Sequence, residues 1–154
     1  MGVLCDYFVA ADDAAAIAAL DLLGPGGSPA SVHGEAAGLD SIDLKGIEPA
    51  VMVGKLVAFV RGIEWEPGLA AGRLLWTPDE DNGPWVTPMP NAARDTLAGI
   101  APEDIPRLAE RWATIEEFRG GADAAACGAI IEQISSLARR ARDADHRVYA
   151  WLSL

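Results

Sequence analysis

The sequence is poor in the residues from which metal and thiol sites are built. It contains two cysteines and two histidines among 154 residues. Two cysteines are too few for a disulfide framework, and Cys5 and Cys127 each lie in an apolar stretch that is typical of a buried thiol. His33 and His146 do not stand at metal-ligand spacing, and no cysteine or acid completes a ligand set. We therefore expect no structural or catalytic metal and no cofactor.

Long apolar runs are also missing. No stretch approaches the roughly 20 apolar residues that a transmembrane helix requires. The N-terminus lacks the basic segment and the extended apolar run of a secretory signal, because Asp6 interrupts it at once. These absences predict a cytoplasmic protein, and the length corresponds to one domain over residues 1–154.

Positive charge is scarce. Twelve Lys and Arg stand against 23 Asp and Glu, which gives a formal net charge of -11. An acidic surface repels phosphate backbones and anionic lipid, so neither nucleic acid nor a membrane is an expected partner. The charge favours a basic protein as partner, although solubility alone is a second explanation.

The pattern of apolar residues predicts strands and helices in irregular order. Strand-like segments are expected at residues 3–9, 39–45, 73–77, 85–87 and 147–152. Helical spacing is expected at residues 12–23, 49–62, 91–97, 102–115 and from 123 onward, with a glycine-rich loop at 24–38. Together they predict an α+β domain, a small mixed or antiparallel sheet with about five helices packed on one face. The apolar final segment must be paired inside this sheet, most simply with the first strand.

The densest acidic cluster is Asp79-Glu80-Asp81, followed by Asn82-Gly83 between two predicted strands. Asn-Gly favours a tight hairpin turn. Because the spacing of these residues does not follow the calcium-binding EF-hand, we expect a solvated turn that could contact a basic partner.

A second candidate site combines acids with a tryptophan. Glu64 and Glu66 flank Trp65 in a predicted loop, and Glu116 and Glu117 follow a predicted helix. These side chains could line a cleft for a small molecule. Adjacent helical residues point about 100° apart, so the Glu116–Glu117 pair fits a solvated helix end equally well.

Five tryptophans are many for this length. Trp112 lies on an apolar helical stripe, and Trp76 and Trp151 lie within predicted strands, which predicts core positions. Trp65 and Trp85 are the candidate anchors for a partner, because tryptophan is enriched in binding hot spots.

The two ends of the chain carry a family resemblance. The opening Met1-Gly2-Val3-Leu4, Tyr7-Phe8 and an acid-capped helix ending in Leu22-Leu23 resemble the opening of YfbM-like bacterial proteins, which are domains of unknown function. The closing layout is similar too, with a helix ending in Arg139-Arg140-Ala141-Arg142, a turn at 143–146 and a final apolar strand. The segment from Trp112 to Phe118 also resembles uncharacterised actinobacterial proteins. The resemblance implies a small bacterial domain and no catalytic residues.

The sequence therefore predicts a non-enzymatic acidic binding protein, such as an immunity protein or antitoxin that inhibits a basic partner. Neither a phosphate-binding loop nor a serine-nucleophile elbow is present. The alternative is a small-molecule-binding domain or enzyme that uses the Trp/Glu cleft.

Overall fold

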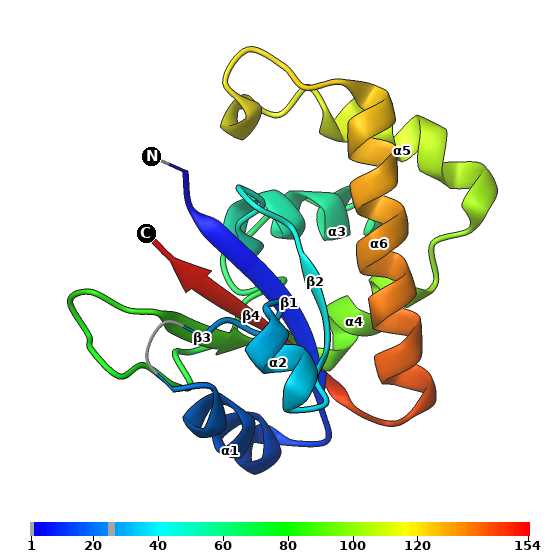
Figure 1. Cartoon of the computed structure of the whole chain (residues 1–154). Helices are drawn as coiled ribbons and strands as arrows, with labels where there is room; N and C mark the ends of the chain where they lie inside the picture. The colour runs from blue at the N-terminus through cyan, green and yellow to red at the C-terminus, as the bar shows by residue number, and fades with distance from the viewer. Residues whose placement is uncertain (1, 25–26) are drawn as a thin grey trace.

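The two ends of the chain form the centre of a four-stranded antiparallel sheet (Figure 1). This computed structural model describes residues 2–24 and 27–154; Met1 and two residues of the predicted loop, Pro25 and Gly26, lie outside the described residues. Strand β1 (Leu4–Ala10) pairs with β4 (Arg147–Ser153) along its whole length. Strand β2 (Asp40–Asp43) lies outside β1, and β3 (Trp85–Pro88) lies outside β4. The predicted α+β class and the interior position of the final strand are confirmed.

Helices cover both faces of this sheet, so the prediction that they pack on one face is wrong. Helices α3 (Gly54–Arg61), α4 (Asn91–Ala98), α5 (Ile105–Trp112) and α6 (Ala124–Asp143) share one apolar core with one face. Helix α1 (Asp13–Leu23) packs on the opposite face with Phe8 and Tyr149, and Figure 1 shows the short α2 (Val32–Ala36) beside it. The cause lies in the central strands, which are apolar on both faces: Tyr7 points into the first core and its neighbour Phe8 into the second.

Acidic caps set the beginnings of two predicted helices. The Asp12 carboxylate accepts a hydrogen bond from the Ala15 N–H at 2.8 Å, immediately before α1. Asp123 caps α6 through Ala125 in the same way. At its C-terminus α1 ends on Gly24, which has a positive φ of 68°. Each acidic cap satisfies a backbone N–H that a helix start leaves free, and the predicted boundaries of α1 and the predicted start of α6 are confirmed.

Two predicted helices begin or end with a different type of turn. The helix expected from Pro49 starts as a π-helix, η1 (Pro49–Val53), and continues as α3. The stretch expected as one helix over 102–115 divides into a 3-10 turn, η2 (Pro102–Asp104), and α5. A further 3-10 turn, η3 (Glu116–Phe118), follows α5.

Three other local predictions are corrected. Helix α2 interrupts the predicted loop, because the Ser31 hydroxyl caps it by accepting from the Gly34 N–H. Residues 73–77 form no strand and contribute a single bridge, between Trp76 and Val86. Asn91 is the first residue of α4 and caps nothing with its side chain.

Candidate functional site

A groove of about 560 Å³ opens where α1 ends, on the sheet face that α1 covers. Four parts of the chain form it: the start of β1, the end of α1 with the residues after it, the segment 76–84, and the end of β4. The lining residues are Leu4, Leu20, Asp21, Leu23, Gly24, Gly27, Trp76, Pro78, Gly83, Pro84, Trp151 and Ser153.

This lining is apolar with one charge. Asp21 is the one acidic or basic side chain among the described residues that line the groove, and Ser153 adds a hydroxyl. The indole N–H of Trp76 donates to Asp21 Oδ1 at 3.3 Å, which joins α1 to the 76–84 segment across the groove. An apolar surface with a few placed polar groups is typical of a binding site.

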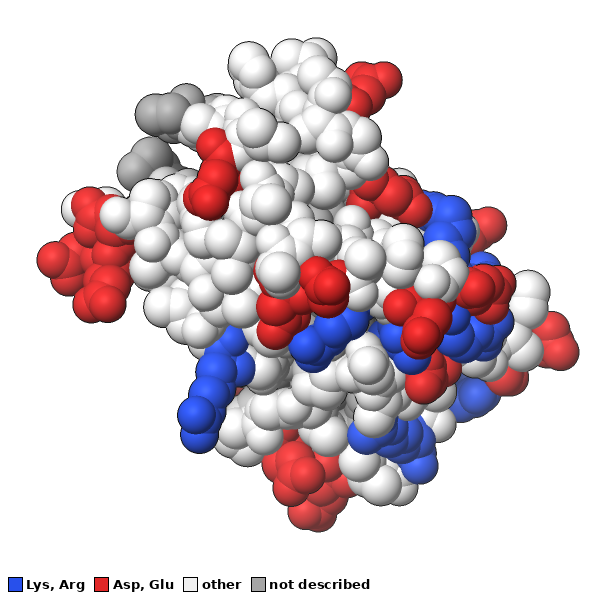
Figure 2. Space-filling model, turned by 90° about the horizontal axis from the view of Figure 1, so that it is seen from below, with Lys and Arg blue, Asp and Glu red and all other residues white. Residues whose placement is uncertain are grey.

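The predicted acidic turn borders this groove. Its residues Pro78, Gly83 and Pro84 line the groove, and Asp79, Glu80 and Asp81 between them are exposed. Figure 2 shows a separate group of acidic side chains at the left edge of the molecule, where Figure 1 places this turn. On the same face, Lys and Arg gather toward the right and are interleaved with acids.

Two of the predicted site residues build the turn. Asp79 accepts from the backbone N–H groups of Asp81 and Asn82 and from the Asn82 side chain, and these hydrogen bonds, that of the side chain first, lower the pKa of Asp79. The Trp85 indole donates to the Glu80 carbonyl at 3.1 Å. Its ring lies against Gly83, where φ is +71° and a Cβ would stand 2.6 Å from the ring. Asp79 and Trp85 therefore shape the turn, and Glu80 and Asp81 are exposed on it.

Beneath the groove lies a buried carboxylate. Asp6 is 4% exposed and stands opposite Trp151 in the sheet. It accepts from the Ala30 N–H at 3.0 Å and so holds the segment after Gly27 against the sheet. Burial raises the pKa of Asp6, and the hydrogen bonds from Ala30 and Ser28 partly oppose this.

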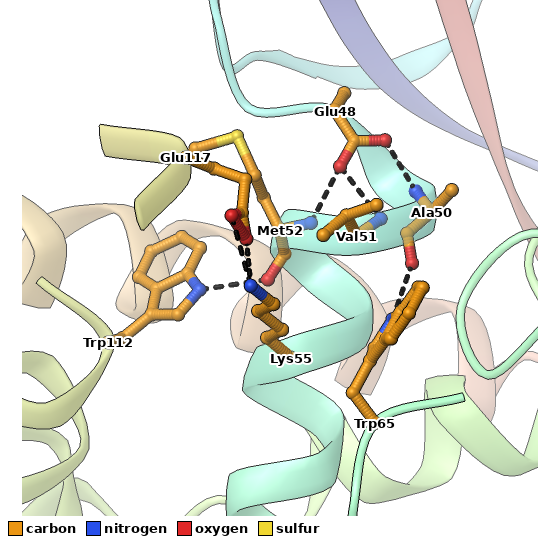
Figure 3. Close-up of polar contacts among 8 residues, drawn as sticks. All are labelled: Glu48, Ala50, Val51, Met52, Lys55, Trp65, Trp112 and Glu117. Atoms are coloured by element: carbon orange, nitrogen blue, oxygen red, sulfur yellow. Dashed lines mark hydrogen bonds and ion pairs between the residues drawn. The ribbon is translucent and has the colours of Figure 1, made fainter. Parts of the chain in front are cut away.

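The predicted anchor Trp65 has a structural contact at a different place (Figure 3). Its indole N–H donates to the Ala50 carbonyl of η1 at 3.0 Å, and the side chain is 36% exposed. A Cβ on Gly54 would lie 2.6 Å from the Trp65 nitrogen, so the glycine allows the close approach. Glu48 caps the same π-helix, with one carboxylate accepting three backbone N–H groups.

Glu117 and Trp112 meet this π-helix segment from another side. Glu117 forms an ion pair with Lys55, the second residue of α3, and both side chains are about four-fifths buried. The Trp112 indole, fully buried, donates to the Met52 carbonyl at 2.8 Å. Trp65 and Glu117 thus hold one segment from different sides (Figure 3).

The remaining acids of the predicted cleft, although neighbours of Trp65 and Glu117 in the chain, take no part in these contacts. Glu64 and Glu66 are exposed in the loop after α3. Glu116 lines a separate open hollow between the end of α5 and the start of α6. The structure therefore places the acidic turn and Trp85 together, Trp65 and Glu117 along the continuous segment of η1 and α3, and Glu116 in the hollow between α5 and α6.

Sequence reasoning missed the residues that complete the groove. Asp21 was not a candidate, and Trp76 and Trp151 were predicted as core. Trp151 is 7% exposed and belongs to the core around Phe8, as predicted, but its ring also lines the groove. The predicted pairing of the first and last strands could have indicated part of the groove, because it brings Leu4 beside Ser153.

The described residues form neither a metal-binding cluster nor a membrane-spanning helix. Nowhere in residues 2–24 and 27–154 do three His, Cys, Asp or Glu side chains come together in a way that could hold a metal ion. Over the same residues, no helix combines the length and the apolar character needed to cross a bilayer.

Comparisons with known proteins give one remote similarity. No family model and no curated protein matches the sequence. Among solved structures, the chain is similar to YfbM from Escherichia coli, a protein of unknown function, with 13% identity and a TM-score of 0.45 over 97% of this chain and 99% of that chain. The YfbM-like resemblance of the sequence is thus found again as a remote structural similarity, and the actinobacterial resemblance stays a prediction.

Proposed function

We propose that this protein is a binding protein that takes a segment of a basic protein partner into the groove beside its acidic turn. A complex between a basic toxin and an acidic immunity protein or antitoxin is one example of such an interaction. The observation that carries the proposal is the juxtaposition of an apolar groove with the turn that bears Asp79, Glu80 and Asp81.

Two of the four parts of the chain that form the groove, the turn and helix α1, are acidic. The turn 77–84 carries three acids and no Lys or Arg. Helix α1 carries Asp13 and Asp21 and no base, and Asp13 is already paired with Arg147. Asp21, Glu80 and Asp81 are therefore the charges available to a partner, and their field attracts a cationic surface and speeds encounter.

The apolar lining supplies a reason for the complex to persist. Leu4 and Leu22 are 42% and 78% exposed, Leu4 in the groove and Leu22 between the lining residues Asp21 and Leu23. Burying such surface against a partner contributes roughly 25 cal/mol per Å², and desolvated aromatic side chains dominate many interfaces. We expect the apolar contacts to set the dissociation rate and the acids to set the association rate.

A small apolar ligand is the second candidate occupant. The groove volume of about 560 Å³ falls within the range of small-molecule sites, roughly 300–1,000 Å³. The polar side chains of its lining, Asp21 and Ser153, suit recognition more than chemistry, because a serine nucleophile needs an adjacent base such as histidine.

Peptide selection distinguishes these candidates. Random peptides displayed on phage are selected on the wild-type protein, and the recovered sequences are synthesised. We expect peptides in which Arg or Lys stands next to apolar residues. Peptides without basic residues, or no enrichment at all, would contradict the proposal and favour the small-molecule alternative.

The acidic turn is then tested with a charge-matched pair of variants. Glu80→Gln/Asp81→Asn removes two charges and leaves Asp79 to hold the turn. Glu132→Gln/Asp145→Asn removes two charges at exposed positions elsewhere. Stopped-flow association of a selected peptide should slow in the first variant only, and the wild-type rate should fall as salt shortens the Debye length from about 10 Å at 0.1 M to about 3 Å at 1 M. Equal rates in the two variants would exclude the turn from the docking site.

A further inference from the structure

We infer that the groove is specific for a cationic side chain, an arginine or lysine of the partner, held between the rings of Trp76 and Trp151 and the carboxylate of Asp21. This inference rests on the proposed function, because it names the side chain that the groove takes from the partner. The anchor that enters the groove is then a cationic side chain and not an apolar one.

The chemistry of the lining points to a cation. Two tryptophans line the groove, and tryptophan is the aromatic side chain that attracts a cation most strongly to its face. Asp21 supplies the counter-charge in the same lining. A leucine-lined site without this acid would take an apolar side chain instead.

Within the described residues, the other charged groups leave Asp21, Trp76 and Trp151 available for a partner. Among the described residues Asp21 forms no ion pair, and its Oδ1 receives only the Trp76 indole, at 3.3 Å. The cation–aromatic contacts of the described chain are Arg111 over Phe59 and Arg147 near Tyr149, so neither groove tryptophan has an internal cation.

The shape suits a long side chain with a charged end. Leu20, Leu23 and Pro84 offer apolar surface for a methylene stem, and Asp21 stands among them. Arginine and lysine bury their stems along apolar surface while the charged group reaches a polar partner. The planar guanidinium also stacks on aromatic faces and binds a carboxylate through two donors, so we expect arginine to bind more tightly than lysine.

The test uses small probes that contain one side chain each. N-acetyl-arginine amide is titrated into the isotopically labelled full chain, and the tryptophan indole N–H signals are followed by NMR. N-acetyl-citrulline amide, nearly isosteric and uncharged, is the matched control ligand. We expect the arginine probe to shift the Trp76 and Trp151 signals saturably and to bind about ten-fold more tightly than citrulline, while the Trp112 signal stays in place.

Two protein variants locate the charge. Asp21→Asn keeps an oxygen for the Trp76 indole and removes the charge, so it should weaken the arginine probe by about ten-fold. Asp145→Asn makes the same change at the opposite end of β4, at an exposed residue whose positive φ of 55° asparagine tolerates, and should leave binding unchanged. Both variants are checked for the wild-type pattern of backbone signals.

The outcomes separate this inference from the proposed function. Equal binding of arginine and citrulline, or a Trp76 signal that the arginine probe does not move, would overturn the cation site. If N-acetyl-leucine amide moves the groove signals instead, the groove takes an apolar anchor, and the proposed docking of a basic partner survives on the peptide selection. Saturable binding of the arginine probe that Asp21→Asn weakens and Asp145→Asn does not would establish the site.

Discussion

Glu48 is the clearest case in which one side chain organises a whole segment of this fold. Its Oε1 accepts from the N–H groups of Val51 and Met52 at 2.7 and 2.6 Å, and its Oε2 accepts from Ala50 at 2.8 Å. Three donors at the start of η1 therefore depend on one half-buried carboxylate, which also lies where the helix dipole favours negative charge.

The loss of unfolding free energy on removing this cap depends on how many acceptor oxygens the substitution removes. Glu48→Gln keeps one carbonyl oxygen for Val51 and Met52 but faces Ala50 with an NH₂ group, which should lower the free energy of unfolding by about 1 kcal/mol. Glu48→Ala removes both acceptor oxygens, so that three backbone N–H groups lose their partner, and it should lower the free energy of unfolding by about 2 kcal/mol, the upper end of the range for N-cap substitutions. For a chain of 154 residues these values correspond to melting temperatures lower by roughly 3 and 6 °C.

Urea and thermal unfolding followed by circular dichroism measure these differences. Glu132→Gln is the charge-matched control, because Glu132 is exposed on α6, and it should change stability by less than about 0.5 kcal/mol. The reasoning fails if Glu48→Ala is as stable as the control. It also fails if the glutamine variant loses as much as the alanine variant, because the retained carbonyl would then contribute nothing.

Two further predictions concern buried polar side chains. Burial raises the pKa of Asp6 from its ordinary value near 3.8, so the folded protein holds this proton more tightly than the unfolded chain, and stability should fall as pH rises through the interval between the two pKa values. The variant Asp6→Asn lacks this titration, so its free energy of unfolding relative to the wild type should increase with pH. Urea unfolding measured across pH tests this. If the two proteins show the same pH dependence, Asp6 does not titrate with a raised pKa. Trp112→Phe should lower the free energy of unfolding by about 3 kcal/mol, because the buried Met52 carbonyl loses its donor and the smaller ring leaves a void. A loss below about 1 kcal/mol in urea unfolding would show that this contact contributes little to stability.

Much of the fold could be predicted because its signals are local. Val148, Ala150 and Leu152 alternate along the last strand, and that alternation places them in the core. Acids before α1 and α6 and a glycine after α1 mark helix ends by their own backbone chemistry. These patterns need no knowledge of distant residues.

What failed depends on contacts made across the fold. Helix α2 follows a segment that distant residues hold in place: the Ala30 N–H donates to the Asp6 carboxylate, and the Pro29 carbonyl accepts from the Ser41 hydroxyl. These contacts cannot be read from the composition of a glycine-rich stretch. The covering of the second sheet face was missed for a related reason, since Phe8 and Tyr149 stack there only once the register of β1 on β4 is known.

The candidate site divides along the same line. The acidic turn was found because Asp79 to Gly83 form it from neighbouring residues. The groove beside it is lined by Leu4, Asp21 and Trp151, which are far apart in the chain. Local sequence patterns do not predict that such distant residues come together. Trp65 was predicted as an anchor for a partner, and in the structure its indole N–H donates to the Ala50 carbonyl.

The position of the groove itself follows from where α1 stops. Strands β1 and β4 are 7 residues long, about 23 Å, whereas α1 has 11 residues and spans only about 16 Å as it runs back along them. Gly24, in its positive-φ conformation, ends the helix before it reaches the start of β1 and the end of β4. Leu4, Trp151 and Ser153 line the groove beyond the last turn of α1, and the 76–84 segment borders the groove with its acids. The end of α1 therefore borders the apolar surface, and under the proposed function the charged turn beside it attracts basic partners.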